Sequence, residues 1–259
     1  MLRPPRALLL DFGGVLVDAP PQPPAPPELV QRVSQLVDGA VSREQIARDI
    51  GEGARAYAVW RDDVGKAAQP VELSHAQVWA DFVTRSWPQE ARDAVEREAT
   101  PLAYAWTWRQ QWAVRPGIPE ALHAAADAGL PMAVVSNTLS GAAHRDYLAA
   151  AGLSGLLAAE FYSDEAGPRK PNPELAHMAV RSLGVPIGDC WFVGDSLKRD
   201  IVCARRAGAG AAILMRSPRT DRESALPHVE PDARIEDGHG LLALLRQSWG
   251  TADRSSART

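Results

Sequence analysis

Polar residues stand at the ends of three apolar runs that have the pattern of buried strands. Asp11 follows "LLL", Ser136 ends "AVVS", and Asp195 follows "CWFVG". A polar side chain is costly in such a place unless it has a partner. A fourth polar residue, Lys170, opens a loop, "KPNP", that precedes a predicted helix. Two carboxylates, a hydroxyl and an ammonium are groups that can carry out chemistry on a phosphate.

Each of these groups has a chemical use at a phosphate. Two acids held close together repel each other, and a magnesium ion with oxygen ligands is a common way to offset that repulsion. One of the acids can also attack phosphorus as a carboxylate nucleophile and form an acyl phosphate. The ammonium then neutralises the nucleophile or the transferring group, and the hydroxyl and nearby backbone N–H groups orient it.

The elements around these residues predict an α/β fold. From Pro116 onward, short apolar strands alternate with helices, for example the strands "PMAVVS" and "AAILM" and the helix "GAAHRDYLAAAG". This alternation predicts a parallel, Rossmann-like sheet with right-handed crossovers, to which "ALLLD" adds a strand from the start of the chain. Because ligands collect at the carboxyl ends of parallel strands, we expect the four polar residues to meet at one edge of the sheet.

A helical segment interrupts this sheet. The proline run "APPQPPAPP" can continue neither a helix nor a central strand, and capping-box spacings at Ser42 and Ser74 follow it. Six of the eight tryptophans lie in this segment, where we expect them to form the core of a helix bundle. We therefore predict an α/β core domain of residues 1–18 and 116–248, a helical domain of residues 19–115 and a disordered tail of residues 249–259.

The composition excludes several classes of protein. A formal net charge of −4 offers no basic stripe for nucleic acid, so we expect no nucleic-acid partner. The two cysteines, Cys190 and Cys203, are too few for a disulfide framework or a structural zinc site. No apolar run approaches the ~20 residues of a membrane span. We expect a cytoplasmic protein with no membrane partner, and small anionic substrates stay open.

Four motifs together resemble those of the haloacid dehalogenase superfamily, in the same order. They are "DFGGVLVD", "VVSNT", "RKPNP" and "VGDSLKRDI". The position of the helical segment resembles that of members with a cap inserted between the first and second motifs. The D-x-G-[GN]-V opening is similar to that of members related to glucose-1-phosphatase and to the phosphatase domain of epoxide hydrolase. The resemblance implies the superfamily's Rossmann-like core and an all-helical cap.

The resemblance also implies a role for each motif residue. Asp11 would be the nucleophile and a magnesium ligand, and Asp195 the second magnesium ligand. Ser136 would bind the phosphate through its hydroxyl, and Lys170 would neutralise charge in the catalytic site. Mg²⁺ would be the cofactor.

Three further positions receive roles in the same way. Asn137 would contribute to phosphate binding, through its backbone amide. Asp200 would lie in the metal's outer shell or orient the lysine. Gly13 stands where phosphatases of the family normally have an aspartate, whose carbonyl binds magnesium and whose side chain protonates the leaving group. Gly13 can supply the carbonyl but not the proton, a transfer worth ~10²–10⁴-fold in rate.

The glycine leaves several alternatives open. The substrate's leaving group could need little protonation, as in anomeric sugar phosphates or acyl phosphates, or a cap residue or water could replace the acid. The protein could instead be a dehalogenase or phosphonatase, which also lack that aspartate. The acid pair in "GDSLKRD" argues against a dehalogenase, and a phosphonatase needs a cap lysine, for which Lys66 is the sole candidate.

The sequence therefore predicts a magnesium-dependent phosphohydrolase that cleaves a small phosphorylated metabolite, such as a sugar phosphate, through an aspartyl-phosphate at Asp11. The alternative from another class is a catalytically weakened protein of the same fold that binds phosphate or regulates without turnover. Oligomeric state and substrate identity are not predicted.

Overall fold

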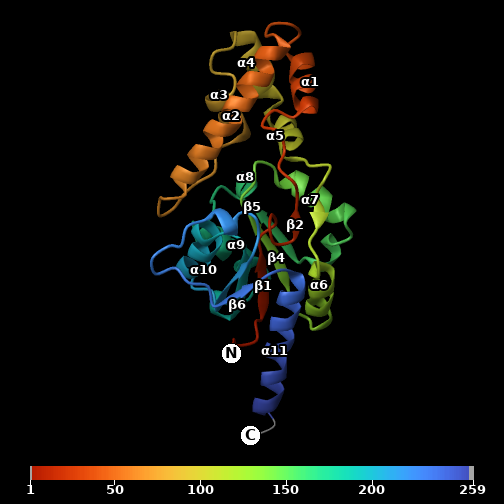
Figure 1. The fold of residues 1–259 in the computed structure, drawn as a ribbon, viewed down its shortest axis with the longest axis vertical. Helices are drawn as coiled ribbons and strands as arrows, with labels where there is room; N and C mark the ends of the chain where they lie inside the picture. Colours follow the sequence, from red (N-terminus) through yellow and green to blue (C-terminus); the bar gives the residue numbers. More distant parts are fainter. Residues whose placement is uncertain (1, 257–259) are drawn as a thin grey trace.

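The computed structural model describes residues 2–256, with side chains described through residue 250. Six parallel strands form its central sheet, in the order β5-β4-β1-β6-β7-β8 (Figure 1). The strands are β1 (Ala7–Leu10), β4 (Met132–Ser136), β5 (Ala159–Tyr162), β6 (Cys190–Gly194), β7 (Ala211–Met215) and β8 (Ala233–Ile235). The parallel α/β sheet predicted from the sequence is confirmed.

Helices cover both faces of this sheet, because its strands are apolar on both sides. Leu8 and Leu10 of β1 pack in one core with helices α6 and α11, while Leu9 points into a second core with α9 and α10. The helices of this part are α6 (Ile118–Asp127), α7 (Gly141–Ala150), α8 (Ser163–Ala166), α9 (Glu174–Leu183), α10 (Val202–Ala207) and α11 (Gly238–Ser256). Short helical turns lie at η1 (Ser154–Leu156), η2 (Ile187–Asp189), η3 (Leu197–Ile201) and η4 (Thr220–Arg222).

Between the first two long strands of the sheet, the chain forms five helices that stand over one end of it (Figure 1). They are α1 (Pro27–Leu36), α2 (Arg43–Val64), α3 (His75–Phe82), α4 (Gln89–Arg97) and α5 (Ala99–Thr107). The predicted caps are present: Ser42 accepts from the Gln45 N–H, and Ser74 forms a full capping box. The segment has a core of its own, in which Trp79, Trp87 and Trp106 are buried. The division of the chain into two domains remains a prediction.

The chain crosses between the helical segment and the sheet at a two-stranded ribbon. In this ribbon β2 (Val17–Asp18) pairs antiparallel with β3 (Ala113–Val114). The buried Arg115 braces the crossing, since its guanidinium donates to the carbonyl oxygens of Gly14, Arg216 (2.7 Å) and Glu236 (2.9 Å). The same side chain pairs with Asp18 at 3.3 Å. The ribbon therefore ties β2 to loops at the carboxyl edge of the sheet.

A second contact joins the helical segment to the sheet domain. The strap, which we define as residues 67–73 between α2 and α3, lies against the loop that follows α8. Glu72 donates its backbone N–H to the Gly167 carbonyl at 2.7 Å, and Arg169 donates its own to the Pro70 carbonyl at 3.1 Å. Val71 and Pro168 form an isolated antiparallel bridge between these hydrogen bonds. The strap thus docks directly before Lys170.

The carboxyl end of the chain departs from the predicted tail. Helix α11 continues to Ser256, so residues 249–256 are helical rather than disordered, while residues 257–259 lie outside the described residues. Leu241 and Leu245 of α11 lie in the same core as α6, Trp249 packs against that core one turn later, and the helix continues beyond it. Of the helices described in residues 2–256, none has both the length and the apolarity to cross a membrane.

Candidate active site

Three of the predicted site residues stand at the carboxyl ends of neighbouring strands. Asp11 follows β1, Ser136 ends β4 and Asp195 follows β6, and the sheet order places β1 between the other two strands. All three side chains are buried. Their placement follows from the parallel register, which brings equivalent strand ends to the same edge.

Lys170 reaches this edge from the loop before α9. Its Nζ lies 2.8 Å from Asp11 Oδ1, 2.6 Å from Asp200 Oδ1 and 2.8 Å from the Val135 carbonyl oxygen. Burial alone would lower the pKa of Lys170, but the two carboxylates outweigh it and raise the pKa above its ordinary value. The ammonium therefore stays charged and holds both acids.

Asn137 fixes the loop that carries this lysine. Its Nδ2 donates to the Lys170 carbonyl at 2.9 Å, and its Oδ1 accepts from the Lys170 N–H at 2.7 Å. The side-chain amide is thus used in two hydrogen bonds with one residue. Any part of Asn137 in phosphate binding is left to its backbone amide, as the resemblance implies.

Three aspartates form a buried acidic cluster at the same edge. One carboxylate oxygen from each of Asp11, Asp195 and Asp200 lies within 4.8 Å of the other two. Asp200 Oδ2 accepts from the backbone N–H groups of Asp195 (3.1 Å) and Ser196 (3.0 Å), while its Oδ1 faces Lys170. Asp200 therefore positions both the lysine and the second acid.

The surroundings move the pKa values of two of these acids in opposite directions. Burial would raise the pKa of Asp11, but the charge and hydrogen bond of Lys170 outweigh it, and Arg219 and the Ser136 hydroxyl lower the pKa further. Burial raises the pKa of Asp195 to about 6, although Arg219 opposes the rise, and the neighbouring acids add to it. The lowered pKa of Asp11 keeps that side chain in its carboxylate form.

Two glycines allow these acids to approach so closely. A Cβ at Gly14, whose φ is +78°, would overlap the Asp195 side chain, and a Cβ at Gly194 would overlap that of Asp200. At Gly13, by contrast, a Cβ would meet no atom within 4 Å. Packing therefore does not require glycine at position 13, and an aspartate there would have room.

The loop after β7 contributes residues that the sequence analysis missed. Ser217 Oγ donates to Asp195 Oδ2 at 2.6 Å, and Arg219 pairs with Asp195 Oδ1 at 3.2 Å. Thr220 Oγ1 donates to the Asp195 carbonyl at 2.5 Å. The signal was available: "AAILM" was predicted as a strand, and the reasoning applied to the other strand ends would have pointed to residues 216–220.

A cavity of about 480 Å³ lies between this edge and the helical segment. From the sheet side it is lined by Asp11, Gly13, Ser136, Asn137 and Arg219, among others. From the helical side it is lined by Arg55, Tyr57, Arg61, Trp106 and Arg109, among others. We call it the central cavity.

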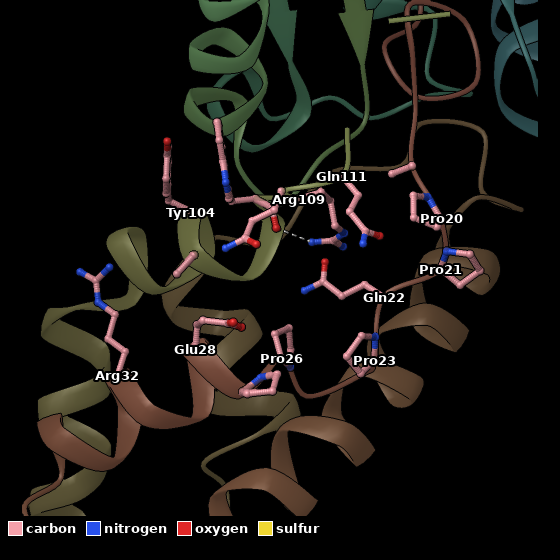
Figure 2. A pocket seen from close by; sticks show the side chains of 15 residues that line it. Pro20, Pro21, Gln22, Pro23, Pro26, Glu28, Arg32, Tyr104, Arg109 and Gln111 are labelled. Carbon is pink, nitrogen blue, oxygen red and sulfur yellow. Dashed lines mark hydrogen bonds between the residues drawn. The ribbon is translucent and has the colours of Figure 1, made fainter. Parts of the chain in front are cut away.

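A second hollow of about 490 Å³ shares part of its lining with the central cavity. Figure 2 shows the side chains that line this second hollow. Pro20, Pro21, Pro23 and Pro26 line one wall of it. Gln22, Pro23 and Arg109 line both cavities. Among the described residues that line the second hollow, Glu28 is the one carboxylic acid, whereas Asp11 of the acidic cluster lines the central cavity.

An imidazole that the sequence analysis assigned no role also lines the central cavity. His144 stacks on Phe12 with ring centroids 3.8 Å apart, and its Nε2 lies 3.3 Å from Thr138 Oγ1. Its Nδ1 has no hydrogen-bond partner among the described residues. Burial lowers the pKa of His144 to about 3, so the ring is neutral near pH 7. It can form a hydrogen bond but does not carry the proton that an aspartate at position 13 would supply.

Two other basic residues, Arg169 of the "RKPNP" motif and the candidate cap lysine Lys66, do not line the central cavity. Arg169 pairs with the buried Glu72 at 2.6 Å, as part of the strap contact. Lys66 is largely exposed and pairs with Asp63 at 2.7 Å. A phosphonatase reaction through Lys66 therefore finds no support in this geometry.

These features define an α/β enzyme whose reactive groups gather at the carboxyl edge of a parallel sheet, under a helical segment. The model of haloacid dehalogenase-like hydrolases matches residues 5–208. The chain belongs to this family of hydrolases.

Individual proteins agree with that assignment. The chain is 28% identical to a phosphoserine phosphatase of Thermus thermophilus over 245 residues, which cover 90% of this chain and 96% of the relative. A predicted phosphoglycolate phosphatase from Haemophilus somnus has a similar fold, with a TM-score of 0.59, 19% identity and coverage of 94% of this chain and 97% of the other. A 2-haloacid dehalogenase from Pseudomonas syringae pv. Tomato DC3000 also has a similar fold, with a TM-score of 0.58 and 17% identity. The match covers 96% of this chain and 100% of the dehalogenase. Since a phosphatase and a dehalogenase share the fold, the site has to distinguish them.

Proposed function

We propose that the protein is a magnesium-dependent phosphohydrolase that acts on a small phosphorylated metabolite through an aspartyl-phosphate at Asp11. The observation that carries this proposal is the buried set of Asp11, Lys170, Asp200 and Asp195 at one edge of the sheet. The relationship to a phosphoserine phosphatase over most of both chains supports it.

The residues present fit a magnesium ion. The three aspartates offer hard oxygen ligands close together, and the raised pKa of Asp195 reflects a negative charge that a cation would stabilise. Asp11, Asp195 and the carbonyl of Gly13 are the groups that would hold it, with Asp200 behind them. When bound, Mg²⁺ supplies positive charge that offsets the acids and the phosphate oxygens.

Asp11 is prepared to act as the nucleophile. Lys170 holds one of its oxygens and keeps the group ionised, while the Ser136 hydroxyl hydrogen-bonds to the same carboxylate. Attack on phosphorus forms the Asp11–phosphate bond as the bond from phosphorus to the leaving oxygen breaks. Water then attacks phosphorus, the bond to Asp11 breaks, and inorganic phosphate and the free carboxylate result.

The leaving oxygen needs a proton that residue 13 does not supply. Among the described residues that line the central cavity, Asp11 is the sole carboxylic acid, and His144 is neutral. Water in the cavity is then the proton source. Substrates whose leaving group needs little protonation, such as anomeric sugar phosphates and acyl phosphates, are favoured.

A phosphate-release assay over a panel of phosphorylated metabolites, with and without Mg²⁺, tests the proposal. We expect magnesium-dependent release by the wild type and a loss of at least about 10³-fold in Asp11→Asn. Equal background release by the two proteins would overturn it.

Gly13 favours a second candidate, a protein that binds a phosphorylated ligand without turnover. Calorimetry distinguishes the two. Tight binding of a phosphorylated ligand by the wild type, with no phosphate released, would identify the binding protein.

A further inference from the structure

The central cavity carries far more positive than negative charge. Among its described lining residues there is one carboxylate, Asp11, against four guanidinium groups, from Arg55, Arg61, Arg109 and Arg219. Arg55 and Arg61 belong to α2, Arg109 follows α5, and Arg219 precedes η4. Three separate parts of the chain therefore bring cations to one cavity.

Of these four arginines, Arg219 is the one that forms an ion pair with a carboxylate among the residues whose side chains are described. Arg55, Arg61 and Arg109 form none there, and Arg61 and Arg109 are held by other contacts. Arg109 Nη1 donates to three carbonyl oxygens at the end of α5, those of Trp106 (2.7 Å), Thr107 (2.7 Å) and Trp108 (3.1 Å). Arg61 lies over the Tyr57 ring, with Cζ 5.0 Å from its centroid.

The positive charges of these arginines are also close enough to repel one another. Burial, together with the charge of Arg61, lowers the pKa of Arg109 to about 10. Partial removal of the Arg61 side chain from water also lowers its pKa, although the residue keeps solvent exposure, and the charges of Arg169 and Arg219 lower the pKa further. An anion between these groups would relieve that repulsion.

The phosphate alone does not account for all of these cations. Lys170 and the proposed magnesium site lie at the sheet edge, beside Asp11 and Ser136, where the transferring phosphate would bind. Arg61 and Arg109 enter the cavity from the helical side, where the rest of the substrate would lie. Arginine has a planar fork of donors that matches a carboxylate or a phosphate in a bidentate manner.

We infer that the central cavity selects phosphorylated metabolites that carry a second anionic group, a carboxylate or a second phosphate, which Arg61 and Arg109 bind. The inference rests on the proposed function for the position of the first phosphate. It adds the substrate class, and it assigns a specificity role to two arginines of the helical segment. Arg219, which pairs with Asp195, is not required for it.

Matched pairs of substrates test the inference. Phosphoglycolate is compared with 2-hydroxyethyl phosphate, O-phosphoserine with O-phosphoethanolamine, and propane-1,3-diol bisphosphate with 3-hydroxypropyl phosphate. The members of each pair differ in the second anionic group. We expect kcat/KM of the wild type with Mg²⁺ to be at least about tenfold higher for the doubly anionic member of at least one pair, because charge-assisted hydrogen bonds are the strong ones.

Variants then assign that preference to the arginines. Arg61→Gln is the first choice, since a ring contact rather than a hydrogen-bond network holds the Arg61 guanidinium. We expect it to reduce the preference about tenfold, mainly through a higher KM for the doubly anionic member. Arg109→Lys keeps the charge but loses the fork, and we expect a smaller loss in the same direction. Arg43→Gln, an exposed arginine on the same helix α2, is the matched control and should change nothing.

The outcomes separate this inference from the proposed function. Equal kcat/KM within every pair, or a preference that survives in Arg61→Gln, would overturn the inference while leaving the phosphohydrolase intact. If none of these six alkyl phosphates is hydrolysed, calorimetry with the same six compounds decides the inference, while the phosphate-release panel, extended to acyl and anomeric sugar phosphates, decides the proposed function. Tighter binding of the doubly anionic members by the wild type than by Arg61→Gln would support it, and equal binding would overturn it.

Discussion

Two of the places where the helical segment meets the rest of the chain, the strap and the central cavity, differ in how their charged groups are paired. At the strap, the carboxylate of Glu72 is buried and accepts from Arg169 (2.6 Å), Ser163 Oγ (2.7 Å) and Tyr57 Oη (3.2 Å). The described lining of the central cavity holds four arginines, Arg61 among them, against one carboxylate, that of Asp11.

The difference indicates that the strap stabilises the fold, whereas the central cavity has the charge of a ligand-binding site. A buried ion pair whose remaining polar atoms are satisfied fixes a geometry, while removing one partner leaves a costly charge. The strap is close to that case: the Glu72 carboxylate has three side-chain donors, although Arg169 Nε has no hydrogen-bond partner among the described residues, and the strap leads directly into the loop of Lys170. At the central cavity, Arg61 and Arg109 have no carboxylate partner among the described side chains, as expected for residues that bind a charged substrate.

The largest expected effect tests this contrast through stability. We expect Glu72→Gln to lower the free energy of unfolding by about 3 kcal/mol, because it leaves the Arg169 guanidinium buried beside a neutral group. We expect Arg61→Gln, on the cavity side, to change it by less than about 0.5 kcal/mol. Urea unfolding of both variants and of the wild type makes the measurement. Equal losses in the two variants would contradict the contrast.

The second-largest expected effect concerns the space available for a side chain at position 13. Because a Cβ there would meet nothing within 4 Å, we expect Gly13→Asp to fold and to raise the hydrolysis of alkyl phosphates by about 10²-fold, since the new carboxyl can protonate the leaving group. Acetyl phosphate, whose leaving group needs little protonation, should gain far less. Gly13→Ala is the control that adds a side chain without an acid. A gain of the same size with both substrates would show that proton transfer does not limit the rate.

The smallest effect concerns the pH dependence of stability in metal-free protein. The pKa of Asp195 is about 6 in the folded protein against an ordinary 3.8, so the folded state holds this proton more tightly than the unfolded chain does. The resulting stabilisation is present below about pH 4 and is lost as the pH rises through 6. We expect this residue to contribute about 1–2 kcal/mol to the loss.

Comparison with a variant isolates that contribution. Thermal or urea unfolding between pH 4 and 7 should show a shallower decline in Asp195→Asn than in the wild type. Asp189→Asn, at an aspartate that pairs with Arg6 on the surface, is the matched control. An unchanged slope in Asp195→Asn would refute the assignment.

Much of the site could be predicted because its signals are local. Asp11, Ser136 and Asp195 each end an apolar run, and parallel pairing of adjacent strands then brings such ends together without further information. The helix starts at Ser42 and Ser74 are local in the same sense: both serines cap their helices, and at Ser74 the full capping box is present.

The cavity wall could not be predicted in this way. Which faces of α2 and α5 meet the sheet depends on contacts between residues far apart in sequence, such as Glu72 with Arg169 and Arg115 with Glu236. Arg61 and Arg109 therefore resemble ordinary surface arginines in the sequence. Arg219 is a different case. It follows the predicted strand "AAILM", so the reasoning applied to the other strand ends could have identified it as a candidate site residue.

The central claim is that Asp11 carries the phosphoryl group during turnover. Acid-quenched protein, taken while it hydrolyses a substrate in the presence of Mg²⁺, is digested and analysed by mass spectrometry. The account predicts a phosphate on Asp11 and none in Asp11→Asn. Hydrolysis that proceeds with no phosphate on Asp11 at any quench time, or in Asp11→Asn at the rate of the wild type, would contradict it.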